Sequence, residues 1–313
     1  MTTIDRLDQW RQAEIITQDQ HVRITSLVRK DRFSVFLELN ALLYIGVISL
    51  VAGIGWTVQK YFNAFGDVLV LASLSMALAA SFYYCFTRGP NYSKDEVESP
   101  NLLLDYVLYF GCLLLSAELA YLEFRFQLLQ EAWNDYLLFS TVVFFGLAYR
   151  FDNRLVLSLG LSSLAAWFGL TFSRFRLISD DSMRVLALLY AAFIALTGAY
   201  LHRKDIKRHF LETYLHVAAN VAFIALISGL SSSGKTSLLL PLIVLSVAAI
   251  VLGVRYRRFA FVVYGSVFGY FGISVELLRV VRDFEMALIY FIITGTAMVV
   301  SMVYLARKLG REE

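Results

Sequence analysis

Long apolar runs recur along this chain, and they constrain its fold more than any other feature. The first run, Asn40 to Val58, contains no charged side chain and has Trp56 near its end, followed by Gln59 and Lys60. Its length is close to the ~20 residues that a helix needs to cross the ~30 Å hydrocarbon core of a bilayer. About nine similar runs follow, so the sequence predicts an all-α, polytopic transmembrane helix bundle.

We place ten spans at residues 38–58, 68–86, 102–122, 136–150, 154–172, 185–201, 210–230, 237–254, 259–278 and 285–305. The fourth and fifth runs are short and are separated only by Asp152, Asn153 and Arg154. If these two runs form one re-entrant hairpin, the count falls to eight and the orientation is unchanged.

The composition agrees with a membrane protein. The chain is 58% hydrophobic and only 17% charged, whereas about a quarter of the residues in a soluble domain are charged. The net charge of +3 is too small to indicate nucleic-acid binding. Cys85 and Cys112 both fall inside apolar runs, which favours two buried thiols over a disulfide.

The first 37 residues differ from the rest, because they are polar and mixed in charge. Apolar residues at helical spacing, including Trp10, predict one helix, and Thr17 with Gln20 has the form of a capping box that starts a second. We therefore expect a cytosolic helical hairpin over residues 1–37 and a bundle over residues 38–313. The hairpin either packs against the inner loops or docks a protein partner. No apolar core of a signal peptide precedes the first span, so we expect that span to direct insertion.

The distribution of basic residues predicts the orientation. With ten spans and the N-terminus inside, 20 of the 28 Lys and Arg residues fall on inner segments and 8 on outer loops. Inner loops of membrane proteins carry the excess of Lys and Arg. Both termini are therefore expected in the cytoplasm.

The opening of the chain resembles a known family. Trp10, the stretch AEIITQDQHVRI and the glycine-bearing first span that ends at Trp56 are similar to domain of unknown function 2157, a bacterial family of predicted multi-pass membrane proteins. Glu14 stands where members usually have glycine, and Trp56-Thr57 replaces an Asn-Trp ending. The resemblance covers about residues 7–170. It implies the fold and a bacterial inner-membrane location, but no activity.

Gly229 to Thr236 matches the phosphate-loop pattern G-x-x-x-x-G-K-[ST] at every position. Nucleotide binding by such a loop needs a strand before it and a helix after it. Here the segment joins two apolar helices and lies outside by the charge distribution. We interpret it as a flexible outer connection that binds no nucleotide.

The seventh span carries a polar stripe. His209, Glu212, His216 and Asn220 are spaced by three, four and four residues and so share one helical face. Three interpretations stay open, namely hydrogen bonding between helices, a proton or ion path, and a metal site. His209 and His216 are about two turns apart, which argues against one shared metal ion, and we predict no metal and no cofactor.

Two further carboxylates lie within predicted spans. Glu118 falls in the outer part of the third span and Glu276 in that of the ninth, with Arg279 three residues beyond Glu276. They either form structural ion pairs near the surface or line an outward-opening polar pocket.

Small residues four apart predict close helix packing. Such pairs are Ser49 with Gly53, Ala191 with Ala195, and Gly265 with Gly269. We expect most of these seams to form within the chain, while a homodimer through the ninth span stays an alternative.

No nucleophile and base, metal-ligand set or carboxylate pair stands at usable spacing, so we expect no enzyme. The leading hypothesis is an inner-membrane scaffold, partner or regulatory protein, with residues 1–37 as the interaction surface. The alternative is a transporter or channel for an ion or small solute that uses the polar residues of the third, seventh and ninth spans.

Overall fold

The computed structural model describes residues 10–11, 15–18, 20, 36–97, 101–173, 180–233, 236–280 and 284–311. Over these residues the protein is all-α, as predicted, with ten α-helices, two short 3-10 helices and no strand. The α-helices are α3 (Phe36–Phe65), α4 (Asp67–Arg88), α5 (Leu102–Phe126), α6 (Asp135–Phe151), α7 (Arg154–Ser173), α8 (Asp180–Arg203), α9 (Phe210–Ser233), α10 (Leu239–Arg255), α11 (Phe259–Val280) and α12 (Phe284–Arg311). The 3-10 helices are η1 (Gln130–Ala132) and η2 (Thr236–Leu238).

Eight helical segments are long and apolar enough to cross a membrane: those in α4, α5, α7, α8, α9, α11 and α12, and the segment Thr236–Arg255 that contains α10. They correspond to eight of the ten predicted spans. The first predicted span lies in α3, whose described apolar segment is Ala41–Thr57. The fourth lies in α6, which at 17 residues is at the lower limit for a span.

The fourth and fifth apolar runs form two separate helices, because the chain reverses at Asp152. This residue ends α6 in the left-handed conformation, with φ of 59°. Asn153 then caps α7, since its Oδ1 accepts hydrogen bonds from the backbone N of Leu155 and Val156 at 3.0 and 2.9 Å. Side-chain caps of this kind satisfy the amide hydrogens that the first turn of a helix leaves without partners.

The chain divides into two compact units, Met1–Ala64 and Phe65–Glu313. The predicted boundary between hairpin and bundle, at residue 37, falls inside the first unit, to which α3 belongs. Most of the predicted hairpin lies outside the described residues. Its capping box is present: Thr17 N donates to Gln20 Oε1 at 2.9 Å, and Gln20 N donates to Thr17 Oγ1 at 3.3 Å.

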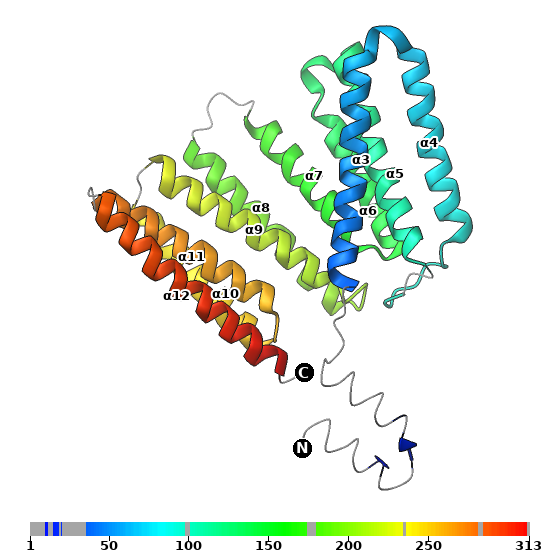
Figure 1. The fold of residues 1–313 in the computed structure, drawn as a ribbon. Helices are drawn as coiled ribbons and strands as arrows, with labels where there is room; N and C mark the ends of the chain where they lie inside the picture. Colours follow the sequence, from blue (N-terminus) through cyan, green and yellow to red (C-terminus); the bar gives the residue numbers. More distant parts are fainter. Residues whose placement is uncertain are drawn as a thin grey trace. The chain divides into compact units, whose positions relative to one another are not determined.

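In the second unit, consecutive helices pack as hairpins, α4 with α5, α6 with α7, α8 with α9 and α10 with α11 (Figure 1). Helix α5 also contacts α6 and α7, and α9 contacts α7, α10 and α11. Helix α12 packs on α11, with hydrogen bonds between the hydroxyls of Tyr270 and Thr294 and between those of Ser274 and Tyr290. The hairpins therefore follow one another in space as they do in sequence.

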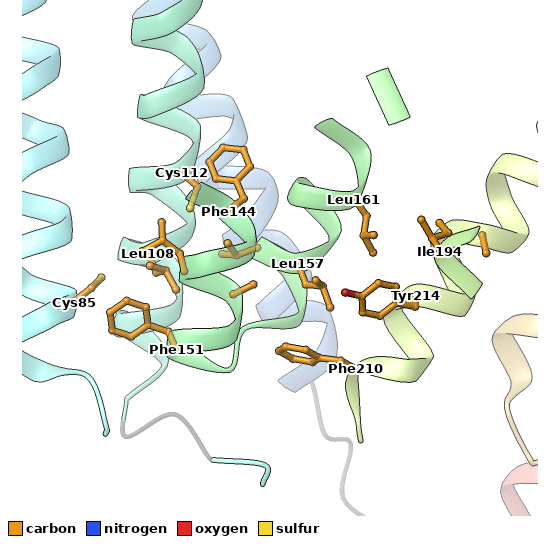
Figure 2. Packing of buried hydrophobic residues seen from close by; sticks show 14 of the residues in the cluster. Cys85, Leu108, Cys112, Phe144, Phe151, Leu157, Leu161, Ile194, Phe210 and Tyr214 are labelled. Carbon is orange, nitrogen blue, oxygen red and sulfur yellow. The ribbon is translucent and has the colours of Figure 1, made fainter. Parts of the chain in front are cut away.

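The buried core lies mainly between α5, α6, α7, α8 and α9 (Figure 2). Its residues include Leu108, Phe144, Leu157 and Tyr214, all buried. Cys85 and Cys112 belong to this core as free thiols, which is the prediction made from their apolar surroundings. A second cluster around Phe223 and Leu242 joins α9 to α10 and α11.

The glycine seam of the ninth predicted span packs within the α10–α11 hairpin. A Cβ added at Gly265 would come within 2.4 Å of the Ser246 carbonyl oxygen, and one at Gly269 within 3.0 Å of Ser246 Oγ. The two backbones therefore touch where no larger residue would fit. Ala191 and Ala195 lie on α8, with Ala191 in the core, and Ser49 and Gly53 lie on α3.

Candidate functional site: a charged network at one end of the helices

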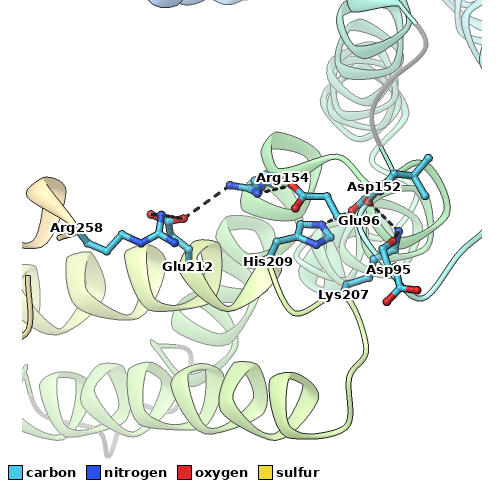
Figure 3. A network of polar contacts seen from close by, with 9 residues as sticks. Asp95, Glu96, Asp152, Arg154, Lys207, His209, Glu212 and Arg258 are labelled. Carbon is cyan, nitrogen blue, oxygen red and sulfur yellow. Dashed lines mark hydrogen bonds and ion pairs between the residues drawn. The ribbon is translucent and has the colours of Figure 1, made fainter. Parts of the chain in front are cut away.

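Four turns of the second unit lie at one end of its helices and are joined by a set of polar contacts in two groups, one around Asp152 and one around Glu212 (Figure 3). The turns are the segment 89–97 after α4 and the connections α6–α7, α8–α9 and α10–α11. We call the set the turn network; its members are Asp95, Glu96, Asp152, Arg154, Lys207, His209, Glu212 and Arg258.

Asp152 is the centre of the network. Its Oδ2 lies 2.9 Å from Lys207 Nζ and accepts a hydrogen bond from Val97 N at 2.6 Å. Its Oδ1 lies 2.5 Å from His209 Nε2. The side chains of Asp152 and Lys207 are only 3% and 1% exposed. Such a buried charge pair is tolerated only when each group has partners that replace its hydration.

The segment after α4 is bonded to Lys207 and to Arg150, which lies near the end of α6. Lys207 Nζ donates to the Asp95 carbonyl oxygen at 3.0 Å, and Lys207 N donates to that of Lys94 at 2.9 Å. Arg150 Nη1 donates to the Pro90 carbonyl oxygen at 2.5 Å. One buried lysine therefore joins three turns, because it contacts the α6–α7 turn and the post-α4 segment from its own place in the α8–α9 turn.

A more exposed branch links the remaining turn. Glu212 Oε2 lies 2.8 Å from Arg258 Nη1 and 3.8 Å from Arg154 Nη1, and Arg154 Nη2 lies 2.8 Å from Glu96 Oε1. Glu212 thus connects the α10–α11 turn to the first turn of α9, while Arg154 extends the link to the segment after α4. Exposed pairs of this type contribute little stability singly.

The four residues of the predicted stripe on the seventh span contact different partners. His209 turns to Asp152 and Glu212 to the arginines, while His216 Nε2 lies 3.7 Å from Glu212 Oε1. The His216 ring stacks on Phe261 at 4.7 Å, and its Nδ1 is buried without a hydrogen-bond partner. Asn220 Nδ2 donates to the His216 carbonyl oxygen of the same helix at 2.8 Å.

The other candidate residues separate into two places. The Ser75 hydroxyl donates to Glu118 within the α4–α5 hairpin. Glu276 pairs with Arg279 at 2.7 Å on α11 and accepts a hydrogen bond from Thr236 Oγ1 at 3.3 Å. The main packing partners of α5 are α4, α6 and α7, and those of α11 are α9, α10 and α12. The predicted pocket of Glu118, Glu276 and Arg279 is thus not assembled as one contact group.

The segment that matches a phosphate loop has its first glycine, Gly229, inside α9, while Thr236 opens η2. Gly234 and Lys235 lie outside the described residues. Among the described side chains, no group of three or more His, Cys, Asp and Glu is placed to hold a metal ion.

Sequence reasoning named two members of the network, His209 and Glu212, but not its centre. Lys207, Arg154 and Arg258 were visible only as basic residues of inner segments. Asp152 gave one usable signal: an Asp-Asn pair between two apolar runs is typical of a tight turn, since both residues tolerate the left-handed conformation.

Comparison with known proteins gives one match. The family model described as Predicted membrane protein (DUF2157) matches residues 8–157. Neither the curated proteins nor the solved structures contain a match to the chain. The resemblance stated from the sequence is confirmed over that range. Residues 8–157, which include α3 to α6, are thus similar to this family of predicted membrane proteins, and the protein is a multi-pass membrane protein.

Proposed function

We propose that this protein is a non-enzymatic scaffold or regulatory protein of the bacterial inner membrane, with ten spans and both termini in the cytoplasm. The observation that carries the proposal is the turn network. A buried, multiply paired Asp152–Lys207 contact ties the connecting segments into one fixed surface, which suits a protein that presents a constant shape to a partner.

The network also supports the orientation. The segments after α4, α6, α8 and α10 are joined by contacts, so they lie at the same end of the helices. These are the segments in which basic residues cluster, including Arg150, Lys204 and Arg255. Positive residues favour the cytoplasmic side. If α3 and α6 are spans beside the other eight, the same argument predicts a cytoplasmic N-terminus.

The placement of the intramembrane polar groups agrees with a structural role. Glu118 is bonded within one hairpin, Glu276 is paired on α11, and Asn220 is bonded to its own helix. Polar groups in a membrane are costly unless they are satisfied by neighbours or by water. Here protein neighbours satisfy these three.

The first unit offers a docking surface. The side chains of Trp10 and Ile15 are 47% and 67% exposed. Large apolar side chains left in water next to a membrane anchor are typical of partner contacts.

Co-purification tests the proposal. The tagged full chain, a chain lacking residues 2–30 and the point variant Trp10→Ala would be isolated from the native membrane in mild detergent. We expect one partner in stoichiometric amount with the full chain, and its loss from both variants. Leu102→Ala, which changes an exposed apolar side chain on α5, serves as the control and should retain the partner. Equal recovery of all proteins with every chain would contradict the proposal.

A transporter or channel is the second candidate, and the buried, unpaired Nδ1 of His216 favours it. Proteoliposomes with an internal pH dye would separate the two. The scaffold predicts proton flux equal to that of empty vesicles, for both the wild type and Glu118→Gln. Flux that the wild type supports and that His216→Gln or Glu118→Gln abolishes, in variants that elute like the wild type, would favour the transporter instead.

A further inference from the structure

A cavity of about 420 Å³ lies between α8 and α9, near the ends of these helices that are opposite the turn network. Met183, Arg184 and Ala187 line it from α8, and Val221, Ile224, Ala225 and Ser228 line it from α9. Among the described residues of this lining, only Arg184 is charged. Cavities of this size that are mostly apolar and carry a few polar groups are typical of ligand sites.

The charged residue lies at the end of the cavity where the headgroups of a bilayer would be. Arg184 lies four residues into α8, about 6 Å from the helix end, and Ser228 is near the end of α9. Val221 lies seven residues before Ser228, about 10 Å further toward the middle of the span. The cavity therefore has a polar end at headgroup depth and an apolar end among the acyl chains.

The structure shows how the arginine is held there. Its side chain is only 11% exposed, and it pairs with Asp181, one turn earlier on α8. A Cβ at Gly229 would come within 2.8 Å of Arg184 Cδ and 2.9 Å of its Nε. The aliphatic part of the arginine side chain thus lies against the α9 backbone at Gly229, where any larger residue would collide with it.

The cavity opens toward the surface of the hairpin. Ile224, one of its lining residues, has an exposed side chain, and so does Val185, which is adjacent to Arg184. In a membrane-spanning hairpin, exposed aliphatic side chains at this depth face lipid. A molecule can therefore enter sideways from the bilayer.

We propose that this cavity binds an anionic phospholipid of the bilayer, with the lipid phosphate at Arg184 and one acyl chain along Val221, Ile224 and Ala225. The guanidinium fork matches the geometry of phosphate oxygens. The inference rests on the membrane-spanning fold and does not depend on the scaffold role.

Asp181 makes the proposal sharply testable, because it competes with the phosphate for the same guanidinium. Removing the positive charge with Arg184→Gln should weaken binding about tenfold or more, which is the magnitude expected for a charge-assisted contact. Removing the competing negative charge with Asp181→Asn should strengthen binding.

The experiment uses the full chain in nanodiscs that contain phosphatidylglycerol with a photoactivatable acyl chain. Cross-linked peptides are mapped by mass spectrometry. We expect labelling of the α9 segment 221–228, a large loss in Arg184→Gln and a gain in Asp181→Asn. Arg203→Gln, at the other end of α8 and exposed, is the matched control and should leave labelling of this segment unchanged. A phosphatidylcholine probe should label it less.

If Arg184→Gln does not fold, Ala187→Phe tests the site instead, because it narrows the cavity and leaves the charge pair in place. It should also reduce labelling of the segment. Equal labelling in Ala187→Phe and wild type would overturn the proposal. So would equal labelling in Arg184→Gln and Arg203→Gln, or equal labelling by the two lipids.

Discussion

At the scale of single residues, Asp152 shows how a turn and a charge pair depend on each other. The residue adopts φ of 59° to reverse the chain, and the same backbone position directs its carboxylate toward Lys207, His209 and Val97 N. Asp and Asn tolerate this conformation better than most residues. Replacing the carboxylate, however, would remove the negative charge that faces the buried ammonium of Lys207.

This residue provides the first stability prediction. Asp152→Asn keeps the tolerance for the left-handed turn and removes only the charge, so it should lower the free energy of unfolding by about 3 to 5 kcal/mol, the usual cost of breaking a buried pair. Lys207→Met should do the same. In the double variant the free energy of unfolding should fall by less than the sum of the two single effects, because no buried charge then remains without its opposite charge. Unfolding by sodium dodecyl sulfate in mixed micelles measures all three.

Arg208→Ala is the control for this cycle. Arg208 pairs with Asp205 three residues earlier, and both side chains are largely exposed. Exposed pairs contribute about 0 to 1 kcal/mol, so this variant should unfold almost as the wild type does. If Asp152→Asn were no worse than Arg208→Ala, the network would not hold the turns together.

At the scale of helices, the apolar pattern predicted most elements to within a few residues. The seventh span, predicted at 210–230, is α9 (Phe210–Ser233), and the ninth, predicted at 259–278, is α11 (Phe259–Val280). The first is the clearest exception, because α3 continues to Phe65 through Gln59 and Lys60. Hydropathy reports where a helix leaves the hydrocarbon, whereas the helix itself ends only where the backbone hydrogen bonds stop.

Helix packing gives the second stability prediction. Gly265→Ala should destabilise the protein by about 1 to 3 kcal/mol, because the new methyl group meets the Ser246 carbonyl oxygen and the α10 and α11 backbones must separate. Gly146→Ala, in α6, is the matched control. Nothing lies within 4 Å of its added Cβ, so the better helix propensity of alanine should leave stability unchanged or raise it by up to about 1 kcal/mol.

The same micelle titration measures both glycine variants. Equal effects of the two substitutions would mean that α10 and α11 do not approach each other at Gly265. The small-residue pattern made this contact predictable, because a pair of glycines four apart has few other uses in a membrane helix.

At the scale of the whole molecule, sequence predicted the class of fold but not the site. Asp152 and Lys207 are 55 positions apart, and Glu212 and Arg258 are 46 apart. Whether such residues meet depends on which hairpins are neighbours in the fold. The spacing of apolar residues within one helix does not determine that. The polar stripe on the seventh span does lie along one helix. Its residues nevertheless contact different neighbours, because α7 and α11 both pack on α9.

The proposed orientation requires that the four joined turns lie together on the cytoplasmic side. Labelling of single cysteines with a membrane-impermeant thiol reagent tests this most directly, in a background where Cys85 and Cys112 are replaced by alanine. Asn91→Cys and Lys204→Cys report on the network end, while Gln130→Cys and Ser237→Cys report on the opposite end. In intact cells with the outer membrane permeabilised, we expect labelling of positions 130 and 237 only, and of all four after lysis. Labelling of positions 91 and 204 before lysis, or of one but not the other, would contradict the account.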